Sequence, residues 1–294
     1  MEEIKVKTCL SSYRANSSWF GHHYNLNIYK GCSHGCIYCD SRSDCYRIEN
    51  FDVVRGKENA LLILEKELKS RRKKGVIGSG AMSDPYNPQE RIYQLTRQSL
   101  QLIDRYRFGI SLTTKSSLIE RDLDLLVQIK KHSAVLVLMT ITTAQDELAS
   151  IIEPGASKTS QRFETLRKFA DAGIPTGILM MPILPFINDN EENIINILHQ
   201  AKQSGVRSVY PAFGVTLRQN QRDYYYQQLD RHFPGLKQKY IQTFGERYIC
   251  DSPHAHRLSQ LFQRECDHLK IMTKMSDIIA DYQSGYGDEQ LKLF

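Results

Sequence analysis

Short apolar runs alternate with amphipathic helical patterns from about residue 26 to residue 210, and this alternation constrains the fold more than any other feature. The run at residues 134–141 is almost unbroken, as is typical of a parallel strand covered on both faces. Repeated strand–helix units predict an α/β protein whose parallel sheet is either open and doubly wound or barrel-like. In both arrangements the functional site lies at the carboxyl ends of the strands.

The same pattern predicts where each element lies. Strands are expected at residues 26–29, 76–78, 108–112, 134–141, 175–181 and 206–210. Helices are expected at residues 58–72, 118–129, 163–170 and 190–201, with another opened by Pro88. After about residue 215 we expect helices at residues 222–232, 236–243 and 255–270, no clear strand, and a flexible linker from Asp281. The predicted domains are therefore an α/β unit (1–215), a helical extension (216–280) and a flexible tail (281–294).

The composition is that of an ordinary globular protein. The chain has 294 residues and a formal net charge of +6, which is compatible with a polyanionic partner but does not require one. No segment approaches the roughly 20 apolar residues that span a bilayer. The first residues are acidic and do not resemble a secretory signal. We expect a cytoplasmic protein that does not associate with membranes.

Three of the seven cysteines, Cys32, Cys36 and Cys39, form a CxxxCxxC motif directly after the first predicted strand. A tight loop of this spacing can present three thiolates to a 4Fe-4S cluster and leave one iron without a protein ligand. An open metal position is the mark of a chemical site. The alternatives are a zinc site, with His34 as a strained fourth ligand, and buried thiols without a metal.

With the aromatic Tyr38 before the last cysteine, the motif resembles the signature of radical S-adenosylmethionine (SAM) enzymes. The resemblance implies a partial (β/α)6 barrel with a C-terminal helical extension. It also implies a 4Fe-4S cluster held by the three cysteines, SAM on the open iron, and a 5′-deoxyadenosyl radical that abstracts hydrogen from the substrate. The resemblance further implies a partner protein, an electron donor of the flavodoxin or ferredoxin type.

A narrower resemblance is to the family related to spore photoproduct lyase. It rests on sequence blocks that occur in the same order, at residues 79–90, 95–97, 114–116 with Arg121 and Asp122, 153–155 with Arg162, and 185–189. These blocks cover about residues 25–220, which makes the match more specific than the cysteines alone.

The resemblance also implies the SAM-binding residues: Ser83 and Asp84 for the methionine end, Lys115 for the carboxylate, Thr140 or Thr143 for the ribose, and Tyr38 beside the adenine. A cation for a carboxylate and an aromatic ring for a purine are chemically suitable. Two alternatives stay open: residues 83–85 as a helix cap, and Lys115 as a solvated lysine at the end of a strand.

One position departs from the family. Photoproduct lyases place a hydrogen-donating cysteine two residues before the Ser-Asp pair, where this chain has Ala81. Cys45, Cys250 and Cys266 are the remaining candidates for a donor. The departure predicts a substrate other than spore photoproduct.

The last residues, Gln290, Leu291, Leu293 and Phe294, resemble the short peptide with which bacterial polymerases and repair proteins bind the sliding clamp. A peptide of this kind on a flexible linker raises the local concentration of a protein near DNA. The alternative is a terminus that folds back onto its own domain.

Other candidates are weaker: Tyr224, Tyr225 and Tyr226 as a platform for a base, and His22, His23, His254 and His256, for which a structural role is the default. We therefore predict a radical SAM enzyme of DNA repair or DNA modification. The alternatives are a radical SAM enzyme that modifies RNA, a peptide or a small molecule, and a non-enzymatic iron–sulfur factor associated with DNA or the clamp.

Overall fold

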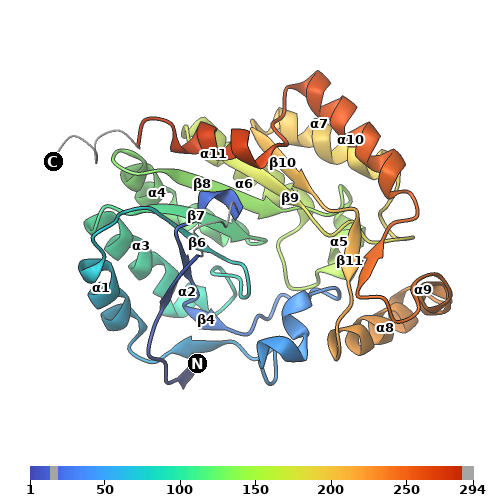
Figure 1. The fold of residues 1–294 in the computed structure, drawn as a ribbon, viewed down its shortest axis with the longest axis horizontal. Helices are drawn as coiled ribbons and strands as arrows, with labels where there is room; N and C mark the ends of the chain where they lie inside the picture. Colours follow the sequence, from blue (N-terminus) through green and yellow to red (C-terminus); the bar gives the residue numbers. More distant parts are fainter. Residues whose placement is uncertain (14–18, 287–294) are drawn as a thin grey trace.

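A computed structural model describes residues 1–13 and 19–286 and is built on one curved sheet with the strand order β10-β9-β8-β7-β6-β3-β2 (Figure 1). Six of its strands are mutually parallel: β3 (Tyr24–Leu26), β6 (Val76–Ser79), β7 (Gly109–Thr114), β8 (Val135–Thr140), β9 (Thr176–Met180) and β10 (Ser208–Pro211). β2 (Leu10–Ser12) adds an antiparallel edge. Because β10 and β2 are edge strands, the sheet is an open, partial (β/α)6 barrel, as predicted.

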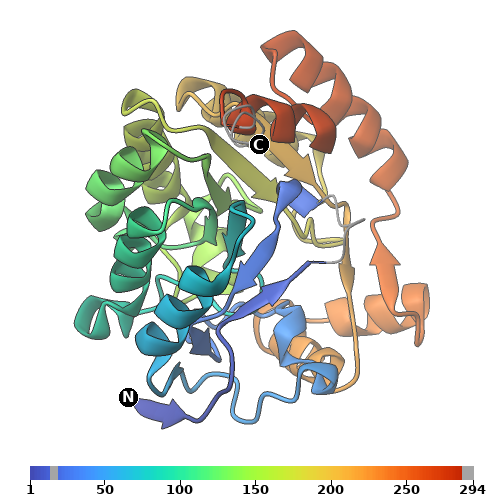
Figure 2. The ribbon, with the colours of Figure 1, turned by 60° about the vertical axis from the view of Figure 1, so that its left-hand side comes forward.

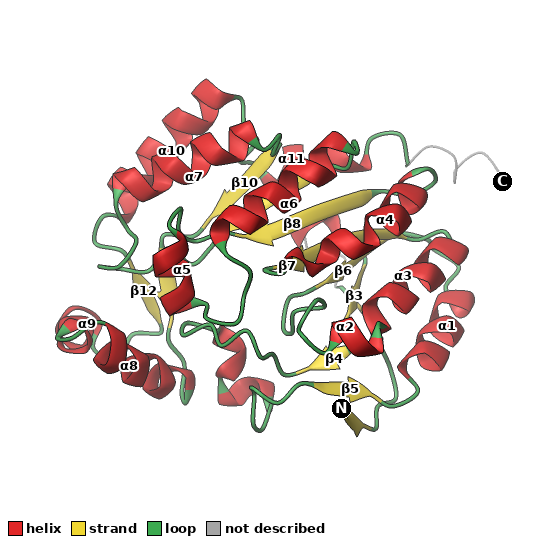
Figure 3. Cartoon of the chain, turned by 180° about the vertical axis from the view of Figure 1, so that it is seen from behind, coloured by secondary structure: helices red, strands yellow, loops and turns green. Residues whose placement is uncertain are grey.

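Helices cover the convex face of the sheet (Figure 3). They are α1 (Ala60–Ser70), α3 (Leu95–Arg105), α4 (Leu123–Lys130), α6 (Thr159–Asp171) and α7 (Glu191–Gln203), with the short α2 (Glu90–Tyr93) and α5 (Asp146–Ile152) nearby. β8 shows why its apolar run is unbroken. Val135 and Val137 pack in the core that includes α1, α3 and α4, whereas Leu136 and Leu138 belong to a separate core on the other face. A strand buried on both faces has no polar side.

The concave face is covered by two segments from opposite ends of the chain, η1 (Trp19–Gly21) and α11 (Met275–Gln283). Tyr282 is buried there and donates a hydrogen bond to the carbonyl of Phe20. The predicted flexible linker therefore begins too early, because the chain is still helical and packed at residues 281–283. The predicted clamp-binding residues 290–294 lie outside the described residues.

A small second sheet, with the order β1-β5-β4, lies beside the first and was not predicted. Its strands are β1 (Glu2–Ile4), β5 (Arg55–Lys57) and β4 (Tyr29–Lys30). The single strand expected at residues 26–29 is in fact divided, since β3 belongs to the large sheet and β4 to the small one.

The C-terminal extension contains α8 (Gln221–His232), α9 (Leu236–Phe244) and α10 (Ala255–Leu269), close to the predicted helices (Figure 2). The expectation that no strand follows residue 215 is wrong. β11 (Gly214–Thr216) pairs antiparallel with β12 (Ile249–Asp251), and a partner 35 positions away leaves no local hairpin pattern in the sequence. Within residues 1–13 and 19–286, no helix is both long and apolar enough to cross a bilayer.

Gly78 lies in the centre of the sheet, beneath the ring of His22. A Cβ atom at Gly78 would lie 2.2 Å from Nδ1 of His22. We expect Gly78→Ala to destabilise the fold by about 1–3 kcal/mol, because overpacking a dense interior forces neighbours off their preferred positions. Chemical denaturation would measure the change in the free energy of unfolding.

The matched control is Gly78→Ala made in the background of His22→Ala, where the obstructing ring is gone. The same glycine substitution should cost clearly less there, and an equal cost in both backgrounds would contradict the proposed clash with the ring of His22.

Candidate active site

The cysteine loop follows β4 and is bent by two glycines. Gly31 has a φ of +83°, and a Cβ there would lie 2.4 Å from the carbonyl oxygen of Val53. The next residue, Cys32, donates its N–H to the carbonyl of Phe51 at 2.8 Å. Gly35 also has a positive φ, of +68°. Only glycine adopts such a conformation at no cost, so the loop shape depends on these two residues.

A second segment, residues 152–155, holds the cysteine loop from the side. The N–H of Ile37 donates to the carbonyl of Ile152 at 3.0 Å, and the N–H of Gly155 donates to the carbonyl of His34 at 2.7 Å. A Cβ at Gly155 would lie 2.6 Å from the carbonyl oxygen of Ser33. The two backbones therefore touch, and the glycine in this block allows the contact.

The three thiols lie in a buried environment that disfavours their charge. Burial raises the pKa of Cys32 to about 11, and it also raises the pKa of Cys36 and of Cys39. The positive charge of Lys115 lowers the pKa of Cys36 and Cys39 and so opposes this effect. Thiols in such a setting stay protonated until a metal takes the place of the proton.

The donor set fits a cluster with one free iron. Cys32, Cys36 and Cys39 lie on one short loop that Gly31 and Gly35 bend, so all three thiols come from the same turn of the chain. Among the described residues no three His, Cys, Asp or Glu side chains converge tightly enough to hold a single metal ion. A cubane cluster requires less convergence, because each thiolate binds a different iron.

Asp84 joins the cysteine loop to the ends of β6 and β7. Its carboxylate accepts hydrogen bonds from the hydroxyl of Thr114 at 2.7 Å, from the N–H of Lys115 at 2.8 Å and from the N–H of Tyr86 at 2.8 Å. Nδ1 of His34 lies 3.3 Å away. Burial alone would raise the pKa of Asp84, but His34 and these donors lower it to about 2. Both carboxylate oxygens are thus occupied by the protein.

Ser83 is also directed at the loop, since its hydroxyl donates to the carbonyl of Gly31. Neither residue caps α2, whose first residue is Glu90. The structure therefore brings Ser83 and Asp84 to the cysteine loop and occupies their polar atoms there.

Glu153 and Arg162 form a fully buried ion pair behind the loop. Nη1 of Arg162 lies 2.5 Å from Oε2 of Glu153 and donates to the carbonyl of Thr140 at 2.9 Å. Glu153 also accepts a hydrogen bond from the hydroxyl of Tyr38. Both charged residues lie in one of the family blocks, but the sequence predicted no role for either. Their place in the same block as Gly155, which touches the cysteine loop, was the sequence signal that they lie near the site.

Lys115 and the two threonines complete the site. Nζ of Lys115 lies 5.7 Å from the centre of the Tyr38 ring. Burial would lower the pKa of Lys115, but the neighbouring Cys36, Glu153 and Cys39 raise it overall. Thr140 is the last residue of β8. The hydroxyl of Thr143 already accepts the N–H of Gln145 at 3.2 Å. All these predicted residues therefore gather at the carboxyl ends of the strands.

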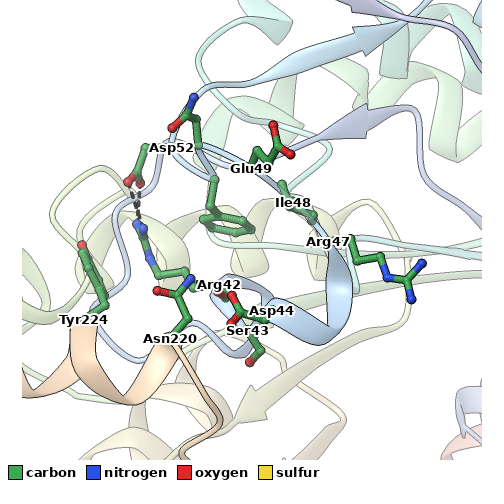
Figure 4. Close-up of a pocket in the computed structure, with 11 residues that line it drawn as sticks. Arg42, Ser43, Asp44, Arg47, Ile48, Glu49, Asp52, Asn220 and Tyr224 are labelled. Atoms are coloured by element: carbon green, nitrogen blue, oxygen red, sulfur yellow. Dashed lines mark hydrogen bonds and ion pairs between the residues drawn. The ribbon is translucent and has the colours of Figure 1, made fainter.

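The C-terminal extension covers another side of the loop. Nε2 of Gln221 donates to the carbonyl of Tyr38 at 3.1 Å. Tyr224 packs on the guanidinium of Arg42, 3.8 Å from the ring centre, at the edge of a cavity of about 450 Å³ (Figure 4). Tyr225 and Tyr226 are buried. Of the three tyrosines proposed as a base platform, only Tyr224 lines this cavity.

The other candidate residues lie apart from the cysteines or in the core. Cys250 is buried in the apolar cluster that also contains Cys36 and Tyr38, whereas Cys266 is buried in a different cluster. Cys45 is exposed, and its sulfur accepts a hydrogen bond from Arg218 at 3.3 Å. Ala81 is exposed at the end of β6. His22 is buried, and His23 accepts the N–H of Val76 at 3.2 Å.

The buried pair leads to a stability prediction. Arg162→Met should destabilise the protein by about 3–5 kcal/mol, because it leaves the carboxylate of Glu153 buried and uncompensated. Arg167→Met on the same helix is the matched control. Its pair with Glu164 is half exposed, so the cost should stay below about 1 kcal/mol.

Thermal and denaturant unfolding of the two variants would measure the difference. The double variant Glu153→Gln, Arg162→Met removes both charges and should regain part of the stability that Arg162→Met alone removes. Equal losses in Arg162→Met and Arg167→Met would contradict the importance of the buried pair.

Known proteins resemble this chain in sequence. The model of the radical SAM superfamily matches residues 26–198. An uncharacterized protein of Methanocaldococcus jannaschii is 34% identical over 175 residues, which cover 58% of this chain and 64% of that protein. An uncharacterized protein of Mycobacterium tuberculosis is 26% identical over 249 residues, or 82% of this chain and 73% of that protein.

Two solved structures share the fold. Spore photoproduct lyase complexed with dinucleoside spore photoproduct aligns with a TM-score of 0.66 and 16% identity, over 91% of this chain and 79% of that one. A radical SAM methyltransferase of Kitasatospora setae, solved with tryptophan and a SAM analogue, aligns with a TM-score of 0.58 and 13% identity, over 92% of this chain and 57% of that one.

Proposed function

The chain belongs to the radical SAM superfamily, and on that premise we propose that it acts on DNA, in repair or modification, with a substrate other than spore photoproduct. One observation supports DNA as the substrate. Over 91% of its length, the chain shares its fold with a lyase that was solved with a dinucleoside lesion. The family blocks from residue 79 to residue 189 support the same interpretation. We expect the lesion or modified base to differ because the position of the hydrogen-donating cysteine is Ala81.

A 4Fe-4S cluster and SAM are the cofactors. Bound together, they supply a 5′-deoxyadenosyl radical by reductive cleavage of SAM. In our proposal Cys32, Cys36 and Cys39 hold the cluster, and Gly31 and Gly35 set the loop that presents them. Residues 152–155 and the C-terminal extension pack against this loop and limit the access of water to it.

Lys115 binds the carboxylate of SAM in this proposal, because its ammonium group lies among the thiols and Tyr38. Tyr38 is fixed by Glu153 and lies beside the adenine. Thr140 is the better ribose partner, since the hydroxyl of Thr143 is already engaged. Ser83 and Asp84 act by positioning the cysteine loop, as their polar atoms bind Gly31, Thr114 and the backbone of Lys115.

Three partners follow from the proposal. They are DNA, a flavodoxin- or ferredoxin-type electron donor, and the bacterial sliding clamp through Gln290, Leu291, Leu293 and Phe294. Deletion of residues 290–294 should abolish clamp binding while leaving the cleavage of free SAM unchanged, which a pull-down and a cleavage assay would test together.

The enzyme class is tested by anaerobic reconstitution and an assay for 5′-deoxyadenosine under reductant. Wild-type protein should release 5′-deoxyadenosine, and Cys36→Ala should not, because the cluster loses one of its three protein ligands. Cys266→Ala is the matched control, since this thiol is buried in another core. Iron incorporation into wild type without any cleavage would favour a non-enzymatic iron–sulfur factor.

The substrate is tested in the same assay by adding ultraviolet-damaged DNA, undamaged DNA or RNA. Faster release of 5′-deoxyadenosine with damaged DNA alone would support the proposal. Stimulation by RNA alone would move the protein to the RNA-modifying class.

Lys115→Gln should raise the KM for SAM about 10- to 100-fold, because a hydrogen bond between charged groups contributes about 1.5–3 kcal/mol. Iron content should be unchanged, which separates loss of SAM binding from loss of the cluster. Lys168→Gln, which removes an exposed lysine paired with Glu120, should leave the KM unchanged. A normal KM in Lys115→Gln would exclude the proposed contact.

A further inference from the structure

A cavity of about 320 Å³ lies directly against the cysteine loop, between the small N-terminal sheet and the end of β6. Its volume is within the range of small-ligand pockets. The wall nearest the cysteines consists of Gly31, Met82 and Ser83. Because Gly31 precedes Cys32 and accepts a hydrogen bond from Ser83, the cavity and the cysteine loop share this wall.

Three lysines give this cavity a positive charge. Lys5, Lys30 and Lys57 line it, and no acidic residue does. In the described part of the chain none of the three forms an ion pair. Lys57 makes only a long hydrogen bond to the carbonyl of Thr8, at 3.4 Å, and Glu2 of β1 pairs with Arg55 instead. The three ammonium groups are therefore available to an anion.

Two other cavities differ from this one in charge or in position. The cavity beside Tyr224 contains both signs, and its Arg42 is already paired with Asp52 (Figure 4). A basic cavity with Lys73 and Lys74 lies at Val76, Gly109 and Ala134, which begin or precede β6, β7 and β8. That is the end of the sheet away from the cysteines. Of the three cavities, the one at Lys30 combines free positive charge with contact to the cysteine loop.

We propose that this cavity binds the DNA backbone next to the reacting nucleotide, with Lys5, Lys30 and Lys57 on its phosphates. The inference rests on the proposed function, since it assumes a DNA substrate. Phosphate contacts from lysine fix the position of a strand without reading its sequence. Tyr46 and the apolar Met82 also line the cavity, and they suit the sugar and base of the same nucleotide.

The test measures binding of fluorescein-labelled oligothymidylate to the reconstituted enzyme by anisotropy, at several salt concentrations. The double variant Lys30→Gln, Lys57→Gln should bind several-fold more weakly. The logarithm of the association constant falls linearly with the logarithm of the salt concentration. The double variant should make this fall less steep, by roughly 0.7 for each lysine–phosphate pair that the substitutions remove. The matched control, Lys73→Gln, Lys74→Gln, removes the same charge at the far end of the sheet and should keep the wild-type slope.

Because Lys57 is partly buried, the exposed Lys5→Gln and the charge-preserving Lys57→Arg serve as further variants. Lys5→Gln should weaken binding, and Lys57→Arg should not. Release of 5′-deoxyadenosine without DNA should be the same in all of them.

The two hypotheses fail in different ways. Wild-type protein that binds no DNA would overturn the proposed function and this inference with it. Wild-type binding with equal slopes in both double variants would overturn only the subsite and would leave DNA as the substrate.

Discussion

The buried ion pair between Glu153 and Arg162 is the interaction on which the rest of the site depends. Arg162 donates to the carbonyl of Thr140 at the end of β8 and pairs with Glu153, which in turn binds the hydroxyl of Tyr38 in the cysteine loop. One pair of charges thereby connects a strand of the sheet to a loop that follows a different sheet. Replacing such a pair by apolar residues is often neutral for stability. Its value here is geometric, since it holds Tyr38 and the end of β8 in one arrangement.

A second connection, through Asp84, works in the same way on the other side of the loop. Asp84 binds Thr114, the backbone of Lys115 and His34. Two negative residues, Asp84 and Glu153, and two positive residues, Lys115 and Arg162, therefore lie near the cysteine loop. Among the neighbouring charges, Lys115 has the largest effect on the thiols of Cys36 and Cys39 and lowers the pKa of both. A negatively charged cluster and an anionic SAM carboxylate would both be attracted to it.

The sequence predicted what depends on local pattern and missed what depends on distant contacts. The apolar run at residues 134–141 predicted β8 because a strand buried on both faces needs no polar residue. The spacing of the three cysteines predicted the tight loop, because all three lie within eight consecutive residues. By contrast, β11 is paired with β12 across two helices, and α11 is held by Phe20 near the other end of the chain. Neither partner is visible within a window of local sequence.

The charge on the two sides of the cysteine loop favours one approach for a polyanion. On the side of the C-terminal extension, Arg42 is paired with Asp52 and covered by Tyr224, so its charge is already compensated. On the side of the N-terminal sheet, Lys30 and Lys57 have no carboxylate partner among the described residues. A phosphate gains more from a free ammonium group than from a paired guanidinium, because no existing ion pair must be broken. The exposed Ala81 directly precedes Met82, which lines the cavity on that same side.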